Sequence, residues 1–591
     1  MIDDLNWAIG GEAGHGIDST GKIFAQALSR AGRHVFTSKV FASRIRGGYT
    51  SYKIRTAIPP VQSVVDRLDV LIALTERTVD ENLNELHDGS IIIYDGERSM
   101  MSNFEPPSNM ISLNVPLQRL AEETGSAIMR NIVALGSSCA ATNFPLTNLD
   151  AALEKQFSRK GSSIVENNKK AALLGYNYVL EQYDNIIFQY TLECTDANYV
   201  LLNGDEAIGL GAIAAGCRFY AGYPITPATA VMNYLKGRIE RFGGHVIQAE
   251  DELSAINLAL GAARTGARSM TATSGPGLDL MTETFGLVSM SETPLVICNV
   301  MRAGPSTGMP TKQEQGDLNT MLYGGHGECE RFILAPTTVA ECFHKTVEAF
   351  NLADKYNLPV YLASDLSLAI TDQTYSPEEF EIESINRERG LFITDSSDLE
   401  PWIDENGNFQ PHAVTETGVS PRTLPGLDGG IHMVTGLEHD SLGRRTELPE
   451  LREQQVLKRK RKLETATSEE SLQYREFGSP DSNILVISWG SNEGAIIEAM
   501  DKLNHEIRFI SVPYILPRPD LTPDIEKASI VFVIECNATG QFSALIEHDT
   551  LSRTNKILKY DGTQFSADEI AEKLNSSLKT EIKIKTEVTI T

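Results

Sequence analysis

The sequence predicts a multi-domain α/β protein. Its 591 residues exceed the ~250 at which a single hydrophobic core usually stops growing, so several domains are expected. Short apolar runs alternate with helix-like patterns in three separate stretches, which is typical of sheets covered by helices. An apolar share of 41% with 22% charged residues belongs to a globular protein rather than a fibrous or disordered one.

The first stretch, residues 1–192, opens with a glycine-rich loop between a strand and a helix. The loop is Gly10-Gly-Glu-Ala-Gly-His-Gly16, and Ile17 to Ala31 then repeats apolar residues at helical spacing. The alternation that follows predicts a parallel sheet with helices on its faces. The segment 184–203 is interpreted as a connector. The expected strands are residues 5–10, 68–75, 90–95 and 110–115.

The second stretch, residues 193–385, repeats the same alternation more plainly. It predicts a doubly wound α/β domain, in which right-handed crossovers bring the carboxyl ends of the strands to one edge. Such an edge is where these sheets bind ligands. The expected strands are residues 217–223, 245–250, 269–274, 294–300 and 358–363.

The periodicity fails in residues 386–476, which are interpreted as an irregular excursion or linker with a charged helix near 447–463. The basic run Lys458 to Lys462 in that helix is expected to be a solvated face rather than a nucleic-acid or targeting signal. Residues 477–591 return to an α/β pattern and predict a compact last domain. Its expected strands are residues 483–488, 507–512 and 529–535.

Composition excludes several function classes. The seven cysteines are scattered without a C-x-x-C, so neither a disulfide framework nor a metal site is predicted in this chain. A formal charge of −27 argues against nucleic-acid binding, which needs basic surface. No apolar run reaches the ~18 residues of a membrane span, and the start lacks the regions of a signal peptide, so a cytoplasmic protein is expected.

The turn Tyr223-Pro-Ile-Thr-Pro227 follows the first strand of the second domain. Thr226 as N-cap with Pro227 at the first helical position is a good helix start signal. The N–H groups at such a start suit an anion. From the residues alone, an ordinary strand-to-helix turn with a capping Thr is the favoured explanation.

Three carboxylates, Glu250, Asp251 and Glu252, lie at the next strand-to-helix junction. Any two of them are explained by helix capping and by the helix dipole. The third is expected to differ, because a carboxyl buried among Ala, Leu and Ile can share its proton with a heteroaromatic nitrogen.

Two small-residue loops follow later strands and should line the same edge. Thr273-Ser-Gly-Pro-Gly277 carries Gly275 and Gly277, which permit close approach of backbone to a ligand. Arg302, in Val300-Met-Arg-Ala-Gly-Pro-Ser-Thr-Gly308, offers a fork for a carboxylate. A surface ion pair is the alternative for Arg302.

Taken together, these motifs resemble the alpha subunit of the 2-oxoacid:ferredoxin oxidoreductases, in the family's order. Residues 1–192 resemble the gamma subunit, although that family's loop usually carries Gln where this chain has Ala13 or His15. The chain is therefore similar to a gamma-alpha fusion. The resemblance implies a Rossmann-like gamma-type domain at 1–192, a pyrimidine-type thiamine diphosphate domain at 193–385, the excursion at 386–476 and a transketolase C-terminal-like domain at 477–591.

The resemblance also implies roles for particular residues. Glu252 would be the activating glutamate that hydrogen bonds the aminopyrimidine ring of thiamine diphosphate. Further cofactor contacts fall on Tyr223, Pro224, Ile225, Gly275 and Gly277. The substrate's C1 carboxylate would meet Thr226 and Arg302, which join Glu252 as the catalytic residues, with Ser306 and Thr307 nearby.

The implied activity is the coenzyme A-dependent oxidative decarboxylation of a 2-oxoacid, with electrons passed to ferredoxin. A partner beta subunit would hold Mg²⁺ with the cofactor's diphosphate, together with a [4Fe-4S] cluster, since this chain lacks the Gly-Asp-Gly…Asn-Asn motif. The loop at 304–318 is most similar to the 2-oxoglutarate branch, with pyruvate or another 2-oxoacid as the alternative. A non-catalytic dinucleotide-binding assembly protein is the second alternative. The motif Glu535 to Gln541 resembles a family motif and could lie at a subunit contact.

Overall fold

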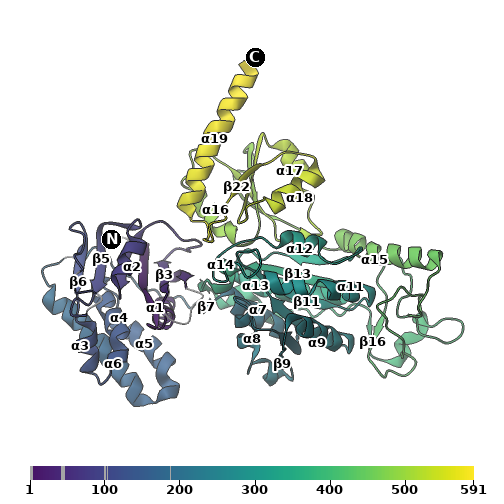
Figure 1. Cartoon of the computed structure of the whole chain (residues 1–591), viewed down its shortest axis with the longest axis horizontal. Coiled ribbons are helices and arrows are strands. Elements are labelled where there is room, and N and C mark those ends of the chain that lie inside the picture. Colours follow the sequence, from purple (N-terminus) through teal and green to yellow (C-terminus); the bar gives the residue numbers. More distant parts are fainter. Residues whose placement is uncertain (1–3, 42–46, 99–100, 103, 187, 591) are drawn as a thin grey trace. The chain divides into compact units, whose positions relative to one another are not determined.

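The computed structural model describes residues 4–41, 47–98, 101–102, 104–186 and 188–590 (Figure 1). The chain divides into two compact units. Unit 1 comprises Met1–Asn203, Ile370–Glu379 and Ser566–Asp568, and unit 2 comprises the remainder. The segment Arg44-Ile-Arg-Gly-Gly48, whose sequence also resembles the gamma subunit, has its residues 44–46 outside the described residues. No helix in the described parts is both long and apolar enough to cross a membrane.

Unit 1 is built on an eight-stranded sheet in the order β6-β5-β4-β1-β3-β2-β14-β7. All four expected strands are found, but the expectation of a parallel sheet was wrong for half of it. Strand β3 pairs antiparallel with both β1 and β2, and β14 pairs antiparallel with β2 and β7. The strands are β1 (Leu5–Glu12), β2 (His34–Val40), β3 (Tyr49–Ala57), β4 (Leu68–Ala73), β5 (Leu86–Tyr94), β6 (Ile111–Asn114), β7 (Val200–Leu202) and β14 (Gln373–Tyr375).

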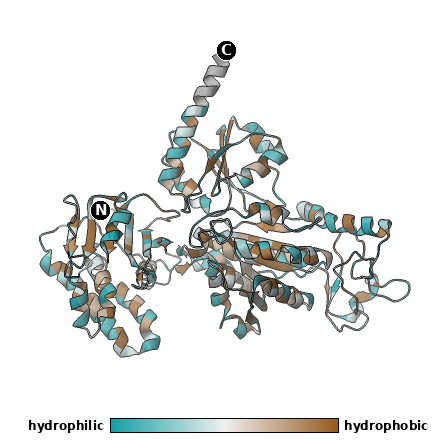
Figure 2. Ribbon diagram, viewed as in Figure 1, coloured by the Kyte–Doolittle hydropathy of each residue, from teal (hydrophilic) through white to brown (hydrophobic). Residues whose placement is uncertain are grey.

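Helices cover this sheet because its strands are apolar on both faces. Every residue of β4 is buried, and Trp7 of β1 packs against Phe24 of α1 with ring centroids 4.9 Å apart. Figure 2 shows the strands largely in brown and the outward helix faces in teal. The helices are α1 (Ile17–Arg30), α2 (Glu76–Asn82), α3 (Leu117–Glu122), α4 (Arg130–Ala141), α5 (Leu146–Phe157) and α6 (Ser162–Gln182).

Strand β14 comes from a part of the chain far from the other strands of unit 1. Its neighbour Asp372 is fully buried, accepts a hydrogen bond from the Tyr52 hydroxyl at 2.7 Å and pairs with Lys39 at 2.8 Å. The backbone of Thr37 donates to the Asp372 carbonyl at 3.0 Å. The two lysines Lys39 and Lys22 therefore hold the pKa of Asp372 below its usual value, against the effect of burial.

Unit 2 begins with a seven-stranded sheet in the order β20-β12-β13-β11-β10-β8-β9. The five expected strands are present and parallel, while β20 joins the edge antiparallel to β12. The strands are β8 (Phe219–Gly222), β9 (His245–Gln248), β10 (Ser269–Thr273), β11 (Leu295–Met301), β12 (Phe332–Leu334), β13 (Pro359–Asp365) and β20 (Tyr514–Leu516). The helices are α7 (Gly204–Ala214), α8 (Thr229–Leu235), α9 (Glu252–Arg264), α10 (Gly275–Leu280), α11 (Thr282–Met290), α12 (Leu318–Tyr323), α13 (Val339–Tyr356) and α14 (Leu366–Ile370).

A five-stranded sheet in the order β17-β19-β18-β21-β22 forms the last part of unit 2. Its strands share one buried cluster with those of the preceding sheet, so that Ile487 and Trp489 belong to the same core as Ile297 and Tyr361. The strands are β17 (Arg475–Gly478), β18 (Ile484–Ser488), β19 (Arg508–Ser511), β21 (Ile530–Glu535) and β22 (Asn555–Leu558). The helices are α16 (Glu493–Met500), α17 (Thr522–Lys527), α18 (Gln541–Thr550) and α19 (Ala567–Ile590).

The excursion before this sheet is irregular, as expected, with a two-residue strand pair β15 (Phe392–Ile393) and β16 (Arg422–Thr423). The expected helix is present as α15 (Pro449–Glu469). The expectation that its basic run is a solvated face was wrong, because Lys458 and Lys462 are both fully buried. Their charges are matched by a buried carboxylate described below.

Candidate functional site

The predicted motifs gather at one edge of the first sheet of unit 2. Strands β11, β10, β8 and β9 are consecutive neighbours and parallel, so their carboxyl ends lie side by side. Each of the four motifs begins at one of these ends. Sheet topology therefore brings together residues that are up to 80 positions apart in the chain.

Glu252 is the buried member of the three carboxylates. Asp251 is the N-cap of α9, and its side chain accepts a hydrogen bond from the backbone of Ser254 at 2.6 Å. Glu250 is exposed, whereas Glu252, the first helical residue, is only 6% exposed. The capping role falls on Asp251, which leaves the Glu252 carboxyl available for a ligand.

Gly277 leaves room for this carboxyl to pack against its backbone. A Cβ at Gly277 would lie 2.7 Å from Oε1 of Glu252 and would also clash with the Thr273 hydroxyl. Since real Cβ atoms do not approach so closely, any side chain at position 277 would displace the glutamate. The glycine that the sequence singled out therefore lies next to the buried acid.

The Tyr223–Pro227 turn was predicted to start a helix at Thr226, and this was wrong. Helix α8 begins at Thr229, and its N-cap Ala228 offers no side-chain hydrogen bond. Residues 226–228 form a turn instead. The local signal was overridden by a long-range contact, because the Thr226 carbonyl accepts a hydrogen bond from Nη1 of Arg302 at 2.7 Å.

Arg302 follows β11 and is 6% exposed, so the alternative of a surface ion pair does not hold. Its Nη1 and Nη2 donate to the carbonyls of Thr226 and Thr307, at 2.7 and 3.2 Å. Its Nε has no partner among the residues the structure describes. Burial lowers the pKa of the guanidinium from its usual value, with Asp317 acting in the opposite sense. The fork is thus tethered by backbone while keeping free donors for an anion.

Ser306 and Thr307 lie on the exposed part of the same loop. Ser306 adopts a positive φ of 58°, and Gly308 fills a position where a Cβ would clash with the Ala303 carbonyl. Only the backbone of Thr307 contacts Arg302 in the structure. The structure therefore places Thr307 against Arg302, with Ser306 as its neighbour in the chain. Tyr223, 39% exposed, and the half-buried Pro224 and Ile225 line the preceding turn.

Asp317 lies at the same sheet edge, and nothing in the sequence predicted its place there. It accepts a hydrogen bond from Nδ2 of Asn299 at 2.9 Å, and a Cβ on Gly275 would lie 3.1 Å from its Oδ1. Burial raises the pKa of Asp317 to about 6. Asp317 stands 15 positions after Arg302 in the chain, and the Gly316-Asp317 pair carries no local signal of such burial.

Several polar atoms at this edge are buried without a partner in the described part of the chain. They are Oγ of Ser274, Oδ1 of Asn299, Oγ1 of Thr271 and Nε of Arg302. Buried polar groups in folded proteins are nearly always hydrogen bonded, so these atoms are able to bond to a polar ligand. These groups and the Glu252 carboxyl at the same sheet edge offer hydrogen-bond donors and acceptors that the nitrogen atoms of a heteroaromatic ring can use.

The glycine-rich loop of unit 1 lines a separate pocket of about 580 Å³. Gly16 caps α1 in a left-handed conformation, and Nδ2 of Asn131 donates to the His15 carbonyl at 2.8 Å. The pocket is lined by Gly14, His15, Thr20, Ile128, Asn131 and Lys160, among others. The loop therefore forms part of the wall of a cavity. A glycine-rich loop by itself does not identify the ligand that such a cavity binds.

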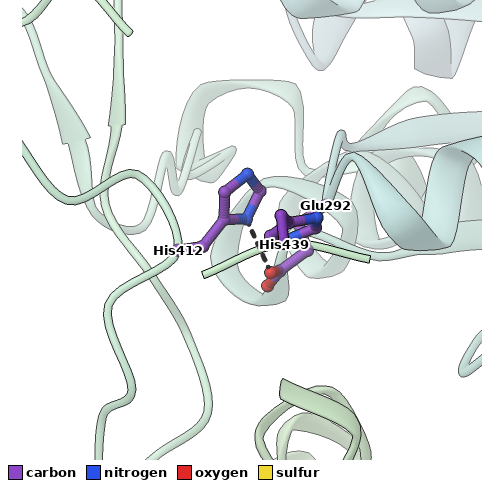
Figure 3. Close-up of side chains that lie close together, drawn as sticks. All are labelled: Glu292, His412 and His439. Atoms are coloured by element: carbon purple, nitrogen blue, oxygen red, sulfur yellow. Dashed lines mark hydrogen bonds and ion pairs between the residues drawn. The ribbon is translucent and has the colours of Figure 1, made fainter. Parts of the chain in front are cut away.

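A buried cluster of Glu292, His412 and His439 lies elsewhere in unit 2 (Figure 3). Nδ1 of His412 lies 3.0 Å from Oε1 of Glu292, and Nδ1 of His439 lies 2.9 Å from the Leu437 carbonyl. Nε2 of each histidine has no partner among the described residues. These three are the one described group of His, Cys, Asp and Glu whose ligand atoms lie within 4.8 Å of one another.

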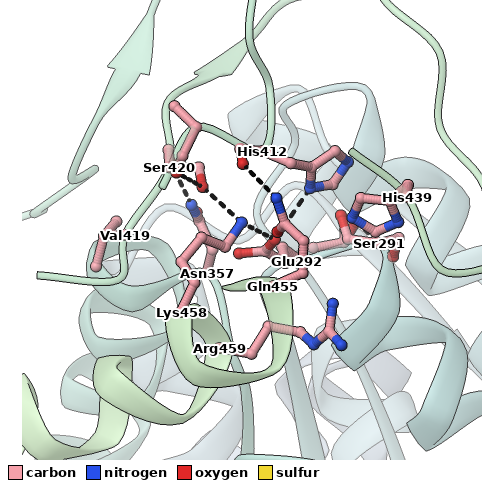
Figure 4. A network of polar contacts seen from close by, with 12 residues as sticks. Ser291, Glu292, Asn357, His412, Val419, Ser420, His439, Gln455, Lys458 and Arg459 are labelled. Carbon is pink, nitrogen blue, oxygen red and sulfur yellow. Dashed lines mark hydrogen bonds and ion pairs between the residues drawn. The ribbon is translucent and has the colours of Figure 1, made fainter. Parts of the chain in front are cut away.

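Two lysines of α15 neutralise the carboxylate of this cluster, and Figure 4 labels one of them, Lys458. Nζ of Lys458 lies 2.5 Å from Oε1 of Glu292, and Lys462 pairs with Oε2. Burial alone would raise the pKa of Glu292, but the two lysines and His412 hold it well below its usual value. A carboxylate that already faces two ammonium groups offers a further cation little attraction. The cluster is therefore an ion network that fastens α15 and the excursion to the turn before β11.

Two family models match the chain. One, described as "Pyruvate flavodoxin/ferredoxin oxidoreductase, thiamine diP-bdg", matches residues 210–458. The other, described as "Pyruvate ferredoxin/flavodoxin oxidoreductase", matches residues 6–178. The first match includes every motif of the site, and the second includes the glycine-rich loop.

Curated relatives and a solved structure match nearly the whole length. The 2-oxoacid:ferredoxin oxidoreductase subunit alpha of Sulfolobus sp. is 30% identical, with 97% of each chain covered. The 2-oxoglutarate oxidoreductase subunit KorA of Mycobacterium tuberculosis is 29% identical over 96% of this chain and 90% of its own. The structure of 2-oxoglutarate:ferredoxin oxidoreductase from Magnetococcus marinus, with 2-oxoglutarate, coenzyme A and succinyl-CoA bound, is 32% identical, covers 98% of this chain and 100% of its own, and has a TM-score of 0.88.

Proposed function

The chain belongs to the 2-oxoacid:ferredoxin oxidoreductase family, and on that premise we propose that it is a fused gamma-alpha subunit whose site binds the aminopyrimidine end of thiamine diphosphate. The observation that carries the proposal is the Glu252 carboxyl, buried against Gly277 and at the same sheet edge as Arg302. Tyr223, Pro224, Ile225, Gly275 and Gly277 would complete the cofactor contacts.

Thiamine diphosphate, when bound, supplies the nucleophilic carbon and the electron sink that decarboxylation of a 2-oxoacid requires. Glu252 would hold a hydrogen bond to a nitrogen of the aminopyrimidine ring and share its proton with it. Arg302, tethered through the carbonyls of Thr226 and Thr307, would direct its remaining N–H groups at the substrate's C1 carboxylate. Thr226, Ser306 and Thr307 would bound the carboxylate on the loop side.

We propose 2-oxoglutarate as the substrate and coenzyme A as the acyl acceptor. The support comes from the relatives: the Mycobacterium protein is named for 2-oxoglutarate, and the Magnetococcus structure holds 2-oxoglutarate, coenzyme A and succinyl-CoA. Pyruvate or another 2-oxoacid remains the alternative, since the Sulfolobus relative is named for 2-oxoacids in general.

A partner beta subunit would supply Mg²⁺ and the cofactor's diphosphate site, and a [4Fe-4S] cluster that passes electrons to ferredoxin. Two features of this chain support that division. Its cysteines are scattered, five of the seven being buried singly, and its sequence lacks the Gly-Asp-Gly…Asn-Asn motif that holds the metal and diphosphate. The relatives named as alpha subunits are consistent with such a partner. A cytoplasmic location stays a prediction.

The test is an anaerobic turnover assay of the chain reconstituted with its beta subunit, thiamine diphosphate, Mg²⁺ and coenzyme A. Ferredoxin reduction and acyl-CoA formation are measured with 2-oxoglutarate, pyruvate and 2-oxobutyrate. We expect the highest kcat/KM with 2-oxoglutarate. A preference for pyruvate would correct the substrate, whereas no turnover with any 2-oxoacid would favour the non-catalytic assembly role.

A further inference from the structure

The C-terminal domain of unit 2, residues 477–565, holds the segment that follows the Arg302 loop. Gln315 of that segment is fully buried. Its backbone N–H donates to the Cys536 carbonyl at 2.6 Å, and its Oε1 accepts from the Cys536 N–H at 2.9 Å and from Nδ2 of Asn492 at 3.1 Å. A buried amide matched on every side is costly to displace.

The close fit around Gln315 extends to the backbone of the C-terminal domain. A Cβ on Gly490 would lie 2.5 Å from Nε2 of Gln315, so only glycine leaves room for this amide. Nε2 also donates to Oδ2 of Asp365, at the end of β13, at 3.1 Å. The segment is therefore fixed between the carboxyl ends of two sheets.

Gln541, the first residue of α18, contacts the segment on both sides of Asp317. Its Nε2 donates to the Gly316 carbonyl at 2.8 Å, and its Oε1 accepts from the backbone of Asn319 at 3.0 Å. Nδ2 of Asn537 adds a bond to the Gln315 carbonyl at 3.2 Å. These residues belong to the Glu535 to Gln541 motif, which therefore contacts a loop of the same chain, while its expected subunit contact stays a prediction.

The far end of the fixed segment reaches the candidate site. Asp317 lies against Gly275 and is hydrogen bonded to Asn299, as described above. The Arg302 loop is tied to the segment through Ala303, whose N–H donates to the Lys312 carbonyl at 3.0 Å. A second tie runs from the Gly304 N–H to Oε2 of Glu314, also at 3.0 Å.

We propose that Gln541 is a positioning residue for the 2-oxoacid site, acting through residues 313–319 on Asp317 and on the Arg302 loop. This proposal rests on the proposed function and gives the C-terminal domain a role in it. A shift of the loop by a fraction of an ångström misplaces the Arg302 fork, and catalytic geometry is sensitive to displacements of that size. Simple packing between two domains would instead affect stability alone.

The test compares Gln541→Ala with wild type in the reconstituted complex. We expect the KM for the 2-oxoacid to rise about tenfold, which is about 1.4 kcal/mol of binding, while the thermal midpoint and the affinity for thiamine diphosphate stay at wild-type values. Gln541→Glu keeps the acceptor for Asn319 but loses the donor to Gly316, so it should raise KM in the same direction. The matched control is His548→Ala on the same helix, whose side chain is 86% exposed, and it should leave KM unchanged.

A wild-type KM in both Gln541 variants would overturn the proposal, and so would a rise in KM that merely follows a fall in the thermal midpoint. If the wild-type complex turns over no 2-oxoacid, the proposed function itself fails. In that case amide hydrogen exchange over residues 302–319 still decides whether Gln541 fixes the loop: faster exchange in Gln541→Ala supports positioning, and unchanged exchange refutes it.

Discussion

Glu252 and Gly277 lie so close together that a Cβ on the glycine would come within 2.7 Å of Oε1 of the glutamate. Glu252→Ala should fold and assemble with its partner subunit, yet lose about 10²- to 10⁴-fold in ferredoxin reduction, the usual contribution of a positioned proton donor or acceptor. The measurement is anaerobic turnover together with cluster absorbance. The exposed neighbour Glu250→Ala is the control, and normal turnover in Glu252→Ala would refute the assignment.

Replacement of Arg302 even by lysine should impair turnover. Its two Nη groups are held by carbonyls, and a lysine cannot make both bonds and still present a fork to a carboxylate. We expect Arg302→Lys to reduce kcat/KM by an amount equivalent to about 2–5 kcal/mol, the cost of losing a buried charged contact. Steady-state kinetics with 2-oxoglutarate provide the measurement. An unchanged KM and kcat would remove Arg302 from the substrate site.

Glu292 should matter for stability rather than for chemistry. Glu292→Gln leaves the ammonium groups of Lys458 and Lys462 buried without a counter-charge, which typically costs about 3–5 kcal/mol. We expect the urea unfolding midpoint to fall. The double variant Glu292→Gln/Lys458→Met should recover part of the loss because it removes one of the uncompensated charges. A midpoint equal to wild type in the single variant would contradict the ion network.

Because His412 is buried, we expect the free energy of unfolding to depend on pH in the acid range. Burial lowers its pKa to about 3 in the folded protein, from about 6.5 in the unfolded chain. Between these values the unfolded chain binds more protons, so the free energy of unfolding falls as pH decreases from 6.5 toward 3. Thermal midpoints across this range should fall less steeply in His412→Gln than in wild type. The exposed His548→Gln should follow wild type, and parallel curves for all three proteins would count against the prediction.

The sequence predicted the strands that carry their signal locally. Strands β4 and β11 are buried along their whole length and mostly apolar in sequence, because helices cover both faces of the sheet, and such runs stand out without knowledge of the fold. Strands β7 and β14 have three residues each and are defined by pairing across some 170 positions. The residues of such short strands give no local sign of a pairing partner that lies so far along the chain.

At the candidate site, too, residues with a local sequence signal were predicted, whereas residues placed by distant contacts were not. Glu252 and Arg302 were found because their motifs follow strands whose ends must converge. The burial of Asp317 and Lys458 was not found, because it depends on Asn299 and on Glu292, which are distant in the chain. The helix start expected at Thr226 failed for a related reason: its carbonyl is taken by Arg302 rather than by the first turn of α8.

Strand β14 limits how the chain can be divided for expression. A fragment ending at residue 192 would lack both β7 and β14, leaving the edge of β2 without the backbone partners that Phe36 and Thr37 have in the intact protein. Lys39 would also lose the buried Asp372 carboxylate. An uncovered strand edge of this kind pairs readily with other chains, so the isolated fragment is expected to aggregate or to self-associate. The complementary fragment carries the missing strand and should restore a soluble pair when the two are produced together.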